Sequence, residues 1–202
     1  MPPLPHPYRN FIHQYATLSD RDWEAVRERL TLREVPRGTT LLREGDVCRH
    51  VWFVATGLLH YTVNREGDEV TKFFTVAPYC FTSQRSFNTG SPARESIVTL
   101  EDCTLWEMSK ASVEELFALP RWSAYVRALT QEVQFYTEEI LEALQNRTAE
   151  DRYREMIAQG DPLLQRVALR HLASYLGIAP QSLSRIRRRV AEEGGGGVPK
   201  EH

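Results

Sequence analysis

Turn signals recur at short intervals between residues 31 and 108, and this spacing constrains the fold more than any other feature. The runs between the turns are rich in Val, Phe, Tyr, Thr and Trp, which favour strands. Short strands joined by Gly-containing turns are typical of an antiparallel sandwich or barrel, with a jelly roll the leading option. The second REGD lies between LLHYTV and EVTKFFTV and predicts a hairpin. The turns are PRG at 36–38, REGD at 43–46 and 65–68, and NTGSP at 88–92.

Helical patterns flank the β-rich stretch. Residues 8–30 are predicted to be helical, with Ser19 or Thr17 as an N-cap. Beyond residue 108 the pattern is helical until a run of four glycines begins at Gly194. The chain is therefore predicted to be α+β. The predicted parts are a β-roll domain at 1–120, a long helix at 121–146, a helical domain at 147–193 and a flexible tail at 194–202.

The long helix carries apolar residues at alternating steps of four and three. This spacing matches the heptad seam of a two-helix coiled coil, whose period is about 3.5 residues. A helix packed on its own domain produces a similar stripe, so both arrangements stay open, and we favour pairing between two copies of the chain. The seam consists of Trp122, Val126, Leu129, Val133, Tyr136, Ile140 and Ala143.

Charge is distributed unevenly along the chain. The net charge is −2, but residues 162–191 contain six arginines and no acidic residue, which leaves −8 on the remainder. A basic segment on an acidic body indicates a module that binds a polyanion. A solvated helix face would give the same charge count, so charge alone does not separate the two interpretations.

The sequence RHLASYLGIAPQSLSRIRRRV at 170–190 is typical of a helix-turn-helix. Gly177 suits a left-handed residue at the end of the first helix, and Pro180 suits the first turn of the second. Gln can pair with adenine and Arg with guanine in the major groove, whereas residues 187–189 suit phosphates. The predicted DNA-binding residues on the outward face are Gln181, Ser182, Ser184, Arg185, Arg188 and Arg189.

Together these segments resemble the Crp-Fnr family of bacterial transcription regulators over nearly the whole chain. The resemblance rests on LLREGD, VWFVATGLLHYTV, PARESIVTLEDCTLWEMSK and RVALRHLASYLGIAPQSLSRIRRRV. It implies an N-terminal double-stranded β-helix of the cyclic-nucleotide-binding type as a sensor, a helix that pairs two subunits, and a helix-turn-helix that binds a palindromic operator. It also implies base contacts from Gln181, Ser182 and Arg185.

The stretch PYCFTSQRSFNTGSPARESI departs from the phosphate-binding cassette of members that bind cyclic AMP. It has no Gly-Glu pair, and Arg94 is followed by Glu95, with Ser96 one place late. We therefore expect that cyclic AMP is not the effector. A packed roll without ligand and a small apolar or anionic effector both stay open. The candidate effector residues are Phe73, Phe74, Phe81, Arg85, Arg94 and Ser96.

The sequence does not indicate an enzyme, a metal site or a cofactor. Cys48, Cys80 and Cys103 form no CxxC pair and lack the N-terminal clustering of oxygen-sensing members. The histidines form no spaced pair that suits haem or the metal set of a cupin enzyme. No signal peptide pattern or membrane-length apolar run is present, so we expect a cytoplasmic protein without a membrane partner.

The predicted function is a homodimeric DNA-binding transcription regulator that binds an inverted repeat. The expected partners are double-stranded DNA and a second copy of the chain, with RNA polymerase and an unknown small-molecule effector as further candidates. The alternatives are a regulator that responds to a cyclic nucleotide or small anion, and a ligand-binding adaptor that does not bind DNA. Because only eleven residues follow Ala191, a β-hairpin wing is expected to be reduced or absent.

Overall fold

The computed structural model describes residues 6–195, which form two compact units. The first unit runs to residue 69 and continues over 73–136, and the second contains 70–72 and the chain from 137 onwards. The boundary lies within the long helix α5 (Pro120–Asn146), so this helix contributes to both units. The other helices of the first unit are α1 (Pro7–Ile12), α2 (Asp20–Arg27), α3 (Gln84–Thr89) and α4 (Lys110–Leu116). Those of the second are α6 (Ala149–Ala158), α7 (Leu163–Arg166), α8 (Leu169–Tyr175) and α9 (Pro180–Gly195).

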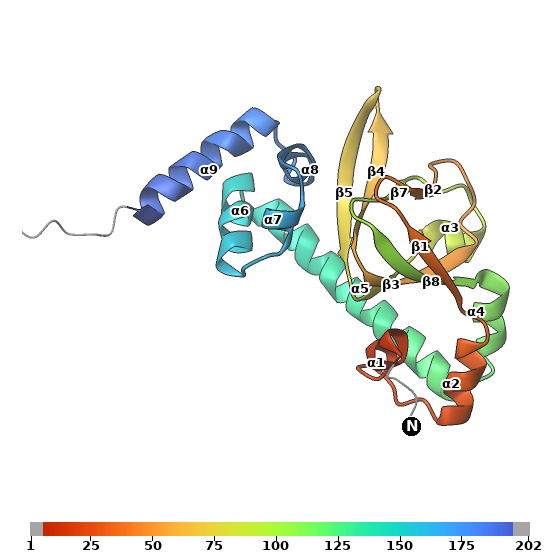
Figure 1. Ribbon diagram of the computed structural model, residues 1–202. Coiled ribbons are helices and arrows are strands. Elements are labelled where there is room, and N and C mark those ends of the chain that lie inside the picture. Colours follow the sequence, from red (N-terminus) through yellow and green to blue (C-terminus); the bar gives the residue numbers. More distant parts are fainter. Residues whose placement is uncertain (1–5, 196–202) are drawn as a thin grey trace, which may run out of the picture. The chain divides into compact units, whose positions relative to one another are not determined.

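The strands form two four-stranded sheets that make a sandwich (Figure 1). Their orders are β1-β8-β3-β6 and β2-β7-β4-β5, so strands distant in the sequence become neighbours. In the antiparallel pair β1–β8, for example, Val35 lies opposite Cys103. The predicted α+β class and the β-roll are thus confirmed. The strands are β1 (Thr31–Val35), β2 (Thr40–Leu42), β3 (His50–Thr56), β4 (Leu58–Arg65), β5 (Asp68–Val76), β6 (Tyr79–Phe81), β7 (Ser96–Thr99) and β8 (Cys103–Ser109).

The turn between β4 and β5 confirms the hairpin predicted at the second REGD. Glu66 and Gly67 have φ angles of 56° and 96°. Two consecutive residues with positive φ are characteristic of the tight turn whose twist matches that of the flanking strands. The Gly67 N–H also donates to the side-chain oxygen of Asn64 at 2.9 Å.

Two apolar clusters stabilise the first unit, one on each face of β3. Trp52 and Val54 face the interior of the roll, whereas the intervening Phe53 faces outward, as strand alternation requires. On the outer face, α1, α2, α4 and α5 cover Phe53 and bury Trp122 and Tyr125. Each fully buried side chain of this size contributes about 1.5–3 kcal/mol through the area removed from water. The first part of α5 is therefore an integral part of the roll domain.

The structure corrects the predicted helices in three places. Residues 8–30 form two separate helices rather than one continuous helical segment. The predicted N-cap at Ser19 is confirmed, since its hydroxyl accepts a hydrogen bond from the N–H of Asp22 at 3.1 Å at the start of α2. The helical pattern before residue 177 is broken between α7 and α8, where Val167 is extended with φ −103° and ψ 134°. The helix α3 was not predicted beside the turn at 88–92.

The end of α9 lies later than predicted. The helix continues to Gly195, past the predicted end at residue 193. The remainder of the predicted tail, residues 196–202, lies outside the described residues, as does any wing.

No helix in the described stretch 6–195 is both long enough and apolar enough to cross a membrane.

Candidate nucleic-acid interface and effector region

The turn between α8 and α9 has the geometry that the sequence predicts. Gly177 has a φ of 73°, which residues with a Cβ rarely adopt. The Ile178 N–H then reaches back to the carbonyl of Ala173 at 3.0 Å, closing the C-terminus of α8. Helix α9 begins at Pro180, as predicted from the sequence. These contacts define the angle between the two helices within the second unit.

A small apolar core joins α8 to α9. Ala173 is completely buried, and its small side chain allows the two helix backbones to approach each other closely. Leu176 of α8 and Leu183 of α9 are at most 1% exposed, and Ile186 one turn later is 9% exposed. Because these residues recur on one side of α9, the opposite side is held toward solvent.

The predicted DNA-binding residues lie on that outward side, and all but one of them are exposed to solvent. Ser182 is half-buried, whereas the other predicted residues are exposed. The Arg185 Nε donates a long hydrogen bond of 3.4 Å to the carbonyl of Gln181, so it rests along its own helix. The exposed side chains of α9 between residues 181 and 189 are Gln181, Ser184, Arg185, Arg187, Arg188 and Arg189.

Arg189 differs from the other arginines on α9 because it is paired with an acidic residue of the same unit. Its guanidinium forms an ion pair with Glu150 in the first turn of α6. Glu150 also accepts a hydrogen bond from Arg154 at 2.8 Å, and Arg154 contacts Glu193 at 2.6 Å. The hydrogen bonds from Arg154 to Glu150 and Glu193 raise the pKa of this arginine.

Helix α6 also supports the turn of the helix-turn-helix, a role that sequence analysis missed. The Arg152 guanidinium donates to the carbonyl of Leu176, near the end of α8, at 2.8 Å. Helix α6 itself begins with a capping box, in which Thr148 and Asp151 satisfy each other's backbone N–H groups. The sequence signals this helix start, but it does not reveal which later residues Arg152 and Glu150 contact.

The long-helix seam divides into a buried part and an exposed part. Trp122 is only 2% exposed and packs in the core of its own unit, and Val126 and Leu129 pack against the same cluster. The seam interpretation placed Trp122 at a subunit interface, but its side chain is occupied within its own unit. Further along, Val133, Ile140 and Ala143 are half-buried. The large apolar residues that α5 exposes are Phe135, Tyr136, Leu141 and Leu144.

The three candidate effector phenylalanines have different surroundings. Phe81 is 5% exposed and stacks on Trp52 inside the roll, with ring centres 5.4 Å apart. Phe74 is 7% exposed and lies parallel to the imidazole of His60. Phe73 makes edge contacts with both Tyr61 and Tyr136, each at 5.7 Å.

The polar effector candidates are partly engaged by the protein itself. Ser96 accepts a hydrogen bond from the N–H of Glu44 at 2.9 Å. The neighbouring Glu95 carboxylate accepts one from the hydroxyl of Ser83, which precedes α3, at 2.6 Å. Arg85 and Arg94 are exposed. The protein therefore places a carboxylate close to the residues that the sequence suggested for an anion.

A chain of polar side chains crosses the outer core, and sequence analysis did not identify it. The Cys80 thiol lies 3.2 Å from the Tyr125 hydroxyl, which donates to Tyr8 at 3.4 Å. Burial raises the pKa of Cys80 to about 12, so it stays a neutral thiol. These residues come from β6, α5 and α1, so the network links the roll to the long helix.

Tyr79 and Tyr15 both lie near the Glu132 carboxylate of α5. Burial together with the Glu132 charge raises the pKa of Tyr79 to about 12, and burial followed by the influence of Glu132 raises the pKa of Tyr15 as well. Both phenols therefore stay neutral beside α5. Only the tertiary fold brings these groups together, so no local pattern could have revealed them.

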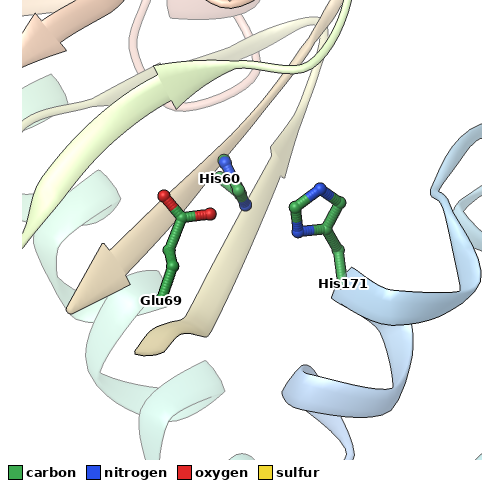
Figure 2. A group of neighbouring side chains, drawn as sticks. All are labelled: His60, Glu69 and His171. Carbon is green, nitrogen blue, oxygen red and sulfur yellow. The ribbon is translucent and has the colours of Figure 1, made fainter. Parts of the chain in front are cut away.

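His60 and Glu69 lie on the neighbouring strands β4 and β5 (Figure 2). Their nearest potential ligand atoms lie within 4.8 Å, and His60 is buried whereas Glu69 is exposed. Figure 2 also draws His171, which is part of α8 in the second unit. None of these residues was predicted to be functional.

One protein-family model matches the part of the chain that forms the β-roll. Residues 32–119 match the family model of the cyclic nucleotide-binding domain. No curated protein sequence matches the chain significantly.

Several solved structures share the fold of this chain. The c-di-GMP responsive global regulator CLP of Xanthomonas campestris is 17% identical with a TM-score of 0.70, covering 87% of this chain and 93% of its own. FixK2 of Bradyrhizobium japonicum is 16% identical with a TM-score of 0.70, covering 85% and 89%. The catabolite activator protein of Thermus thermophilus is 22% identical with a TM-score of 0.53, covering 88% and 85%. The resemblance to the Crp-Fnr regulators is thereby confirmed at the level of the fold.

Proposed function

We propose that the protein is a DNA-binding transcription regulator of the Crp-Fnr type, which binds an inverted repeat as a homodimer. In this proposal residues 1–120 form the sensor-like roll, 121–146 the dimerisation helix and 147–193 the DNA-binding domain. A two-fold dimer requires two half-sites about one helical turn, or about 10 base pairs, apart.

The observation that carries the proposal is the outward side of α9. Buried Leu183 and Ile186 hold the helix against α8, while Gln181, Arg185 and Arg188 remain exposed. A helix that presents amide and guanidinium groups at its N-terminal half suits the major groove, where these groups pair with base edges. Arginines further along suit the phosphates on either side of the groove.

Dimerisation is supported by the second half of α5. The exposed apolar residues Tyr136, Leu141 and Leu144 follow the part of the helix that packs on its own roll. Exposed apolar side chains of this size gain stability when a second helix covers them. Tyr136 belongs to the predicted seam, and Leu141 and Leu144 directly follow its members Ile140 and Ala143. This half of α5 therefore offers an apolar surface that a second copy of the helix could cover.

The proposal does not include cyclic AMP as the effector. The Glu95 carboxylate, held by Ser83 at 2.6 Å, would repel a phosphate placed beside α3. Titration calorimetry with cyclic AMP and with cyclic GMP tests this point, and we expect no saturable heat. Saturable binding at micromolar concentration would instead make the protein a second-messenger sensor.

Duplex binding at several salt concentrations tests the main proposal. The full-length protein is used to select sequences from a random duplex pool, and fluorescence anisotropy then follows binding to a selected duplex between 50 and 200 mM salt. We expect a two-fold symmetric consensus and an affinity that falls steeply with salt, because phosphate contacts release counterions.

A pair of triple variants supplies the control. Replacing Arg185, Arg187 and Arg188 by Ala should abolish duplex binding. Replacing Arg21, Arg43 and Arg65 by Ala removes the same charge from exposed positions in the first unit and should leave binding nearly intact. Equal losses in the two variants, or selection of no consensus, would favour an adaptor that does not read DNA.

A further inference from the structure

The charge network between α6 and α9 gives Arg189 a different environment from the arginines beside it. Glu150 contacts two arginines, Arg154 and Arg189, so one carboxylate is shared between two guanidinium groups. No ion pair is recorded for Arg187 or Arg188 in the part of the chain that the structure describes. The formal charge of α9 therefore overstates the number of arginines that are available to DNA.

The position of Glu150 keeps its carboxylate at this site. It lies in the first turn of α6, where the partial positive charge of a helix N-terminus favours an acidic side chain. Its contact with Arg154 does not depend on Arg189, and its side chain is only 24% exposed. Glu150 would therefore remain in place if Arg189 turned away.

The Arg189 side chain is still accessible to a competing anion. It is 55% exposed, whereas the Glu150 carboxylate that pairs with it is 24% exposed and is therefore screened less by water and salt. A DNA phosphate offers the same chemistry as a carboxylate, with oxygens that accept two guanidinium hydrogen bonds. Glu150 and a phosphate are thus alternative partners for one arginine.

We propose that Glu150 is a positioning residue that holds Arg189 away from DNA and so limits the number of phosphate contacts made by each subunit. This inference rests on the proposed function, because it concerns the strength of duplex binding. In the complex, Arg188 contacts phosphate while Arg189 remains on α6. Removing the Glu150 charge frees Arg189 to make one additional phosphate contact.

The salt dependence of duplex binding measures this contact directly. Four proteins are compared on one duplex between 50 and 200 mM salt: the parent chain, Glu150→Gln, Arg189→Ala and the double variant. Each additional phosphate contact steepens the plot of log affinity against log salt by about 0.9. Glu150→Gln should therefore increase the ratio of the affinities at 50 and 200 mM about 3.5-fold for each bound subunit. Arg189→Ala should leave the slope unchanged, and the double variant should match it.

Glu193→Gln is the matched control. It makes the same change in charge and also removes a contact of Arg154, but it leaves the Glu150–Arg189 pair intact. Its slope should equal that of the parent chain. Far-ultraviolet circular dichroism during heating checks that each variant is folded, and if Glu150→Gln unfolds, Arg189→Ala alone still tests whether Arg189 contacts DNA.

The outcomes separate this inference from the proposed function. A lower slope for Arg189→Ala, or equal changes for Glu150→Gln and Glu193→Gln, would overturn the role of Glu150 while leaving DNA binding established. If none of the proteins, the parent included, binds duplex in a salt-dependent manner, the proposed function itself is wrong.

Discussion

Gly57 lies so close to Cys103 that no side chain fits between them. A Cβ on Gly57 would lie 2.4 Å from the Cys103 thiol and 2.8 Å from the carbonyl of Asp102, at a φ of 109°. We expect Gly57→Ala to lower the free energy of unfolding by about 2–4 kcal/mol, since it combines backbone strain with overpacking. Because all four tryptophans lie in the first unit, urea unfolding followed by their fluorescence measures this change.

Gly38 supplies the comparison for Gly57. It also has a positive φ, 80°, but nothing lies within 4 Å of the position that an added methyl group would take. Gly38→Ala should therefore lower the free energy of unfolding only through backbone strain, by about 1 kcal/mol. Equal losses at the two positions would show that Cys103 relaxes away from the added methyl group.

Arg185 and Arg188 are expected to contribute differently to DNA binding. Arg185 lies one turn after Gln181 on the side proposed to face the bases, so Arg185→Ala should cost about 1–3 kcal/mol on the selected duplex and relax its sequence preference. Arg188→Ala should weaken selected and random duplexes alike and reduce the salt slope. Anisotropy titrations on both duplexes test this division of roles, which is wrong if the two variants lose affinity equally on each.

Ile140 is the position at which to test pairing of the long helix. It is a half-buried member of the predicted seam beyond the part of α5 that packs on the roll. Ile140→Asp should convert a dimer to a monomer, because an unpaired carboxylate is costly to bury at an interface. Sedimentation equilibrium gives the molecular mass. Gln145→Asp adds the same charge at an exposed position of α5 and should leave the mass unchanged.

Thr148 is expected to stabilise the start of α6. Its hydroxyl accepts a hydrogen bond from the Asp151 N–H at 3.1 Å, and the Asp151 carboxylate accepts one from the Thr148 N–H at 3.0 Å. Thr148→Ala should cost about 1 kcal/mol in the unfolding of the second unit. Circular dichroism in urea follows the helices of both units, whereas tryptophan fluorescence reports the first unit, so the two signals together isolate the unfolding of the second unit. Thr148→Ser retains the hydroxyl and should retain most of the stability; a similar loss in both variants would argue against the cap.

Glu107 should make the stability of the roll depend on pH. Burial favours its neutral form, but hydrogen bonds from Trp52 and Arg33 outweigh this effect and lower its pKa below the usual 4.5. The folded state therefore binds a proton less readily than the unfolded state. The resulting stabilisation is complete above pH 4.5 and is lost as the pH falls through the lower pKa of the folded protein.

The variant Glu107→Gln tests this pH dependence. It should be about 1 kcal/mol less stable than the parent at pH 7, because a charge-assisted hydrogen bond becomes a neutral one. The difference should shrink below pH 4.5. Urea unfolding at pH 7 and pH 4 measures the difference in free energy of unfolding between the parent and the variant. A difference that does not vary with pH would mean that Glu107 stabilises the roll through packing and not through its charge.

The parts of the structure that were predictable from the sequence depend on local chemistry. The tight turn at Gly67, the left-handed Gly177 and the start of α9 at Pro180 each need particular residues at adjacent positions. The strand-rich stretch between residues 31 and 108 was recognisable for the same reason. The break near Val167 was missed, since helix-forming residues lie on both sides of it and tertiary packing determines the extended backbone there.

The candidate site was only partly predictable, because exposure and pairing are tertiary properties. The sequence placed Arg189 on the same side as Arg188, but it could not show that Glu150, nearly forty residues earlier, would bind one and not the other. The heptad spacing at Trp122 was equally ambiguous, because a core contact and a subunit contact produce the same pattern. The structure assigns this tryptophan to the core.

Strand β1 leaves the ribosome long before its partner β8 has been synthesised. Thr31 pairs with Glu107, so the edge of β1 has no native neighbour while most of the roll emerges. The outer core is completed later still, when Trp122 and Tyr125 become available. Contacts between such distant residues slow folding and leave strand edges open to wrong pairing. Truncated chains that end before α5 should therefore depend on chaperones, and folding of the first unit should be largely post-translational.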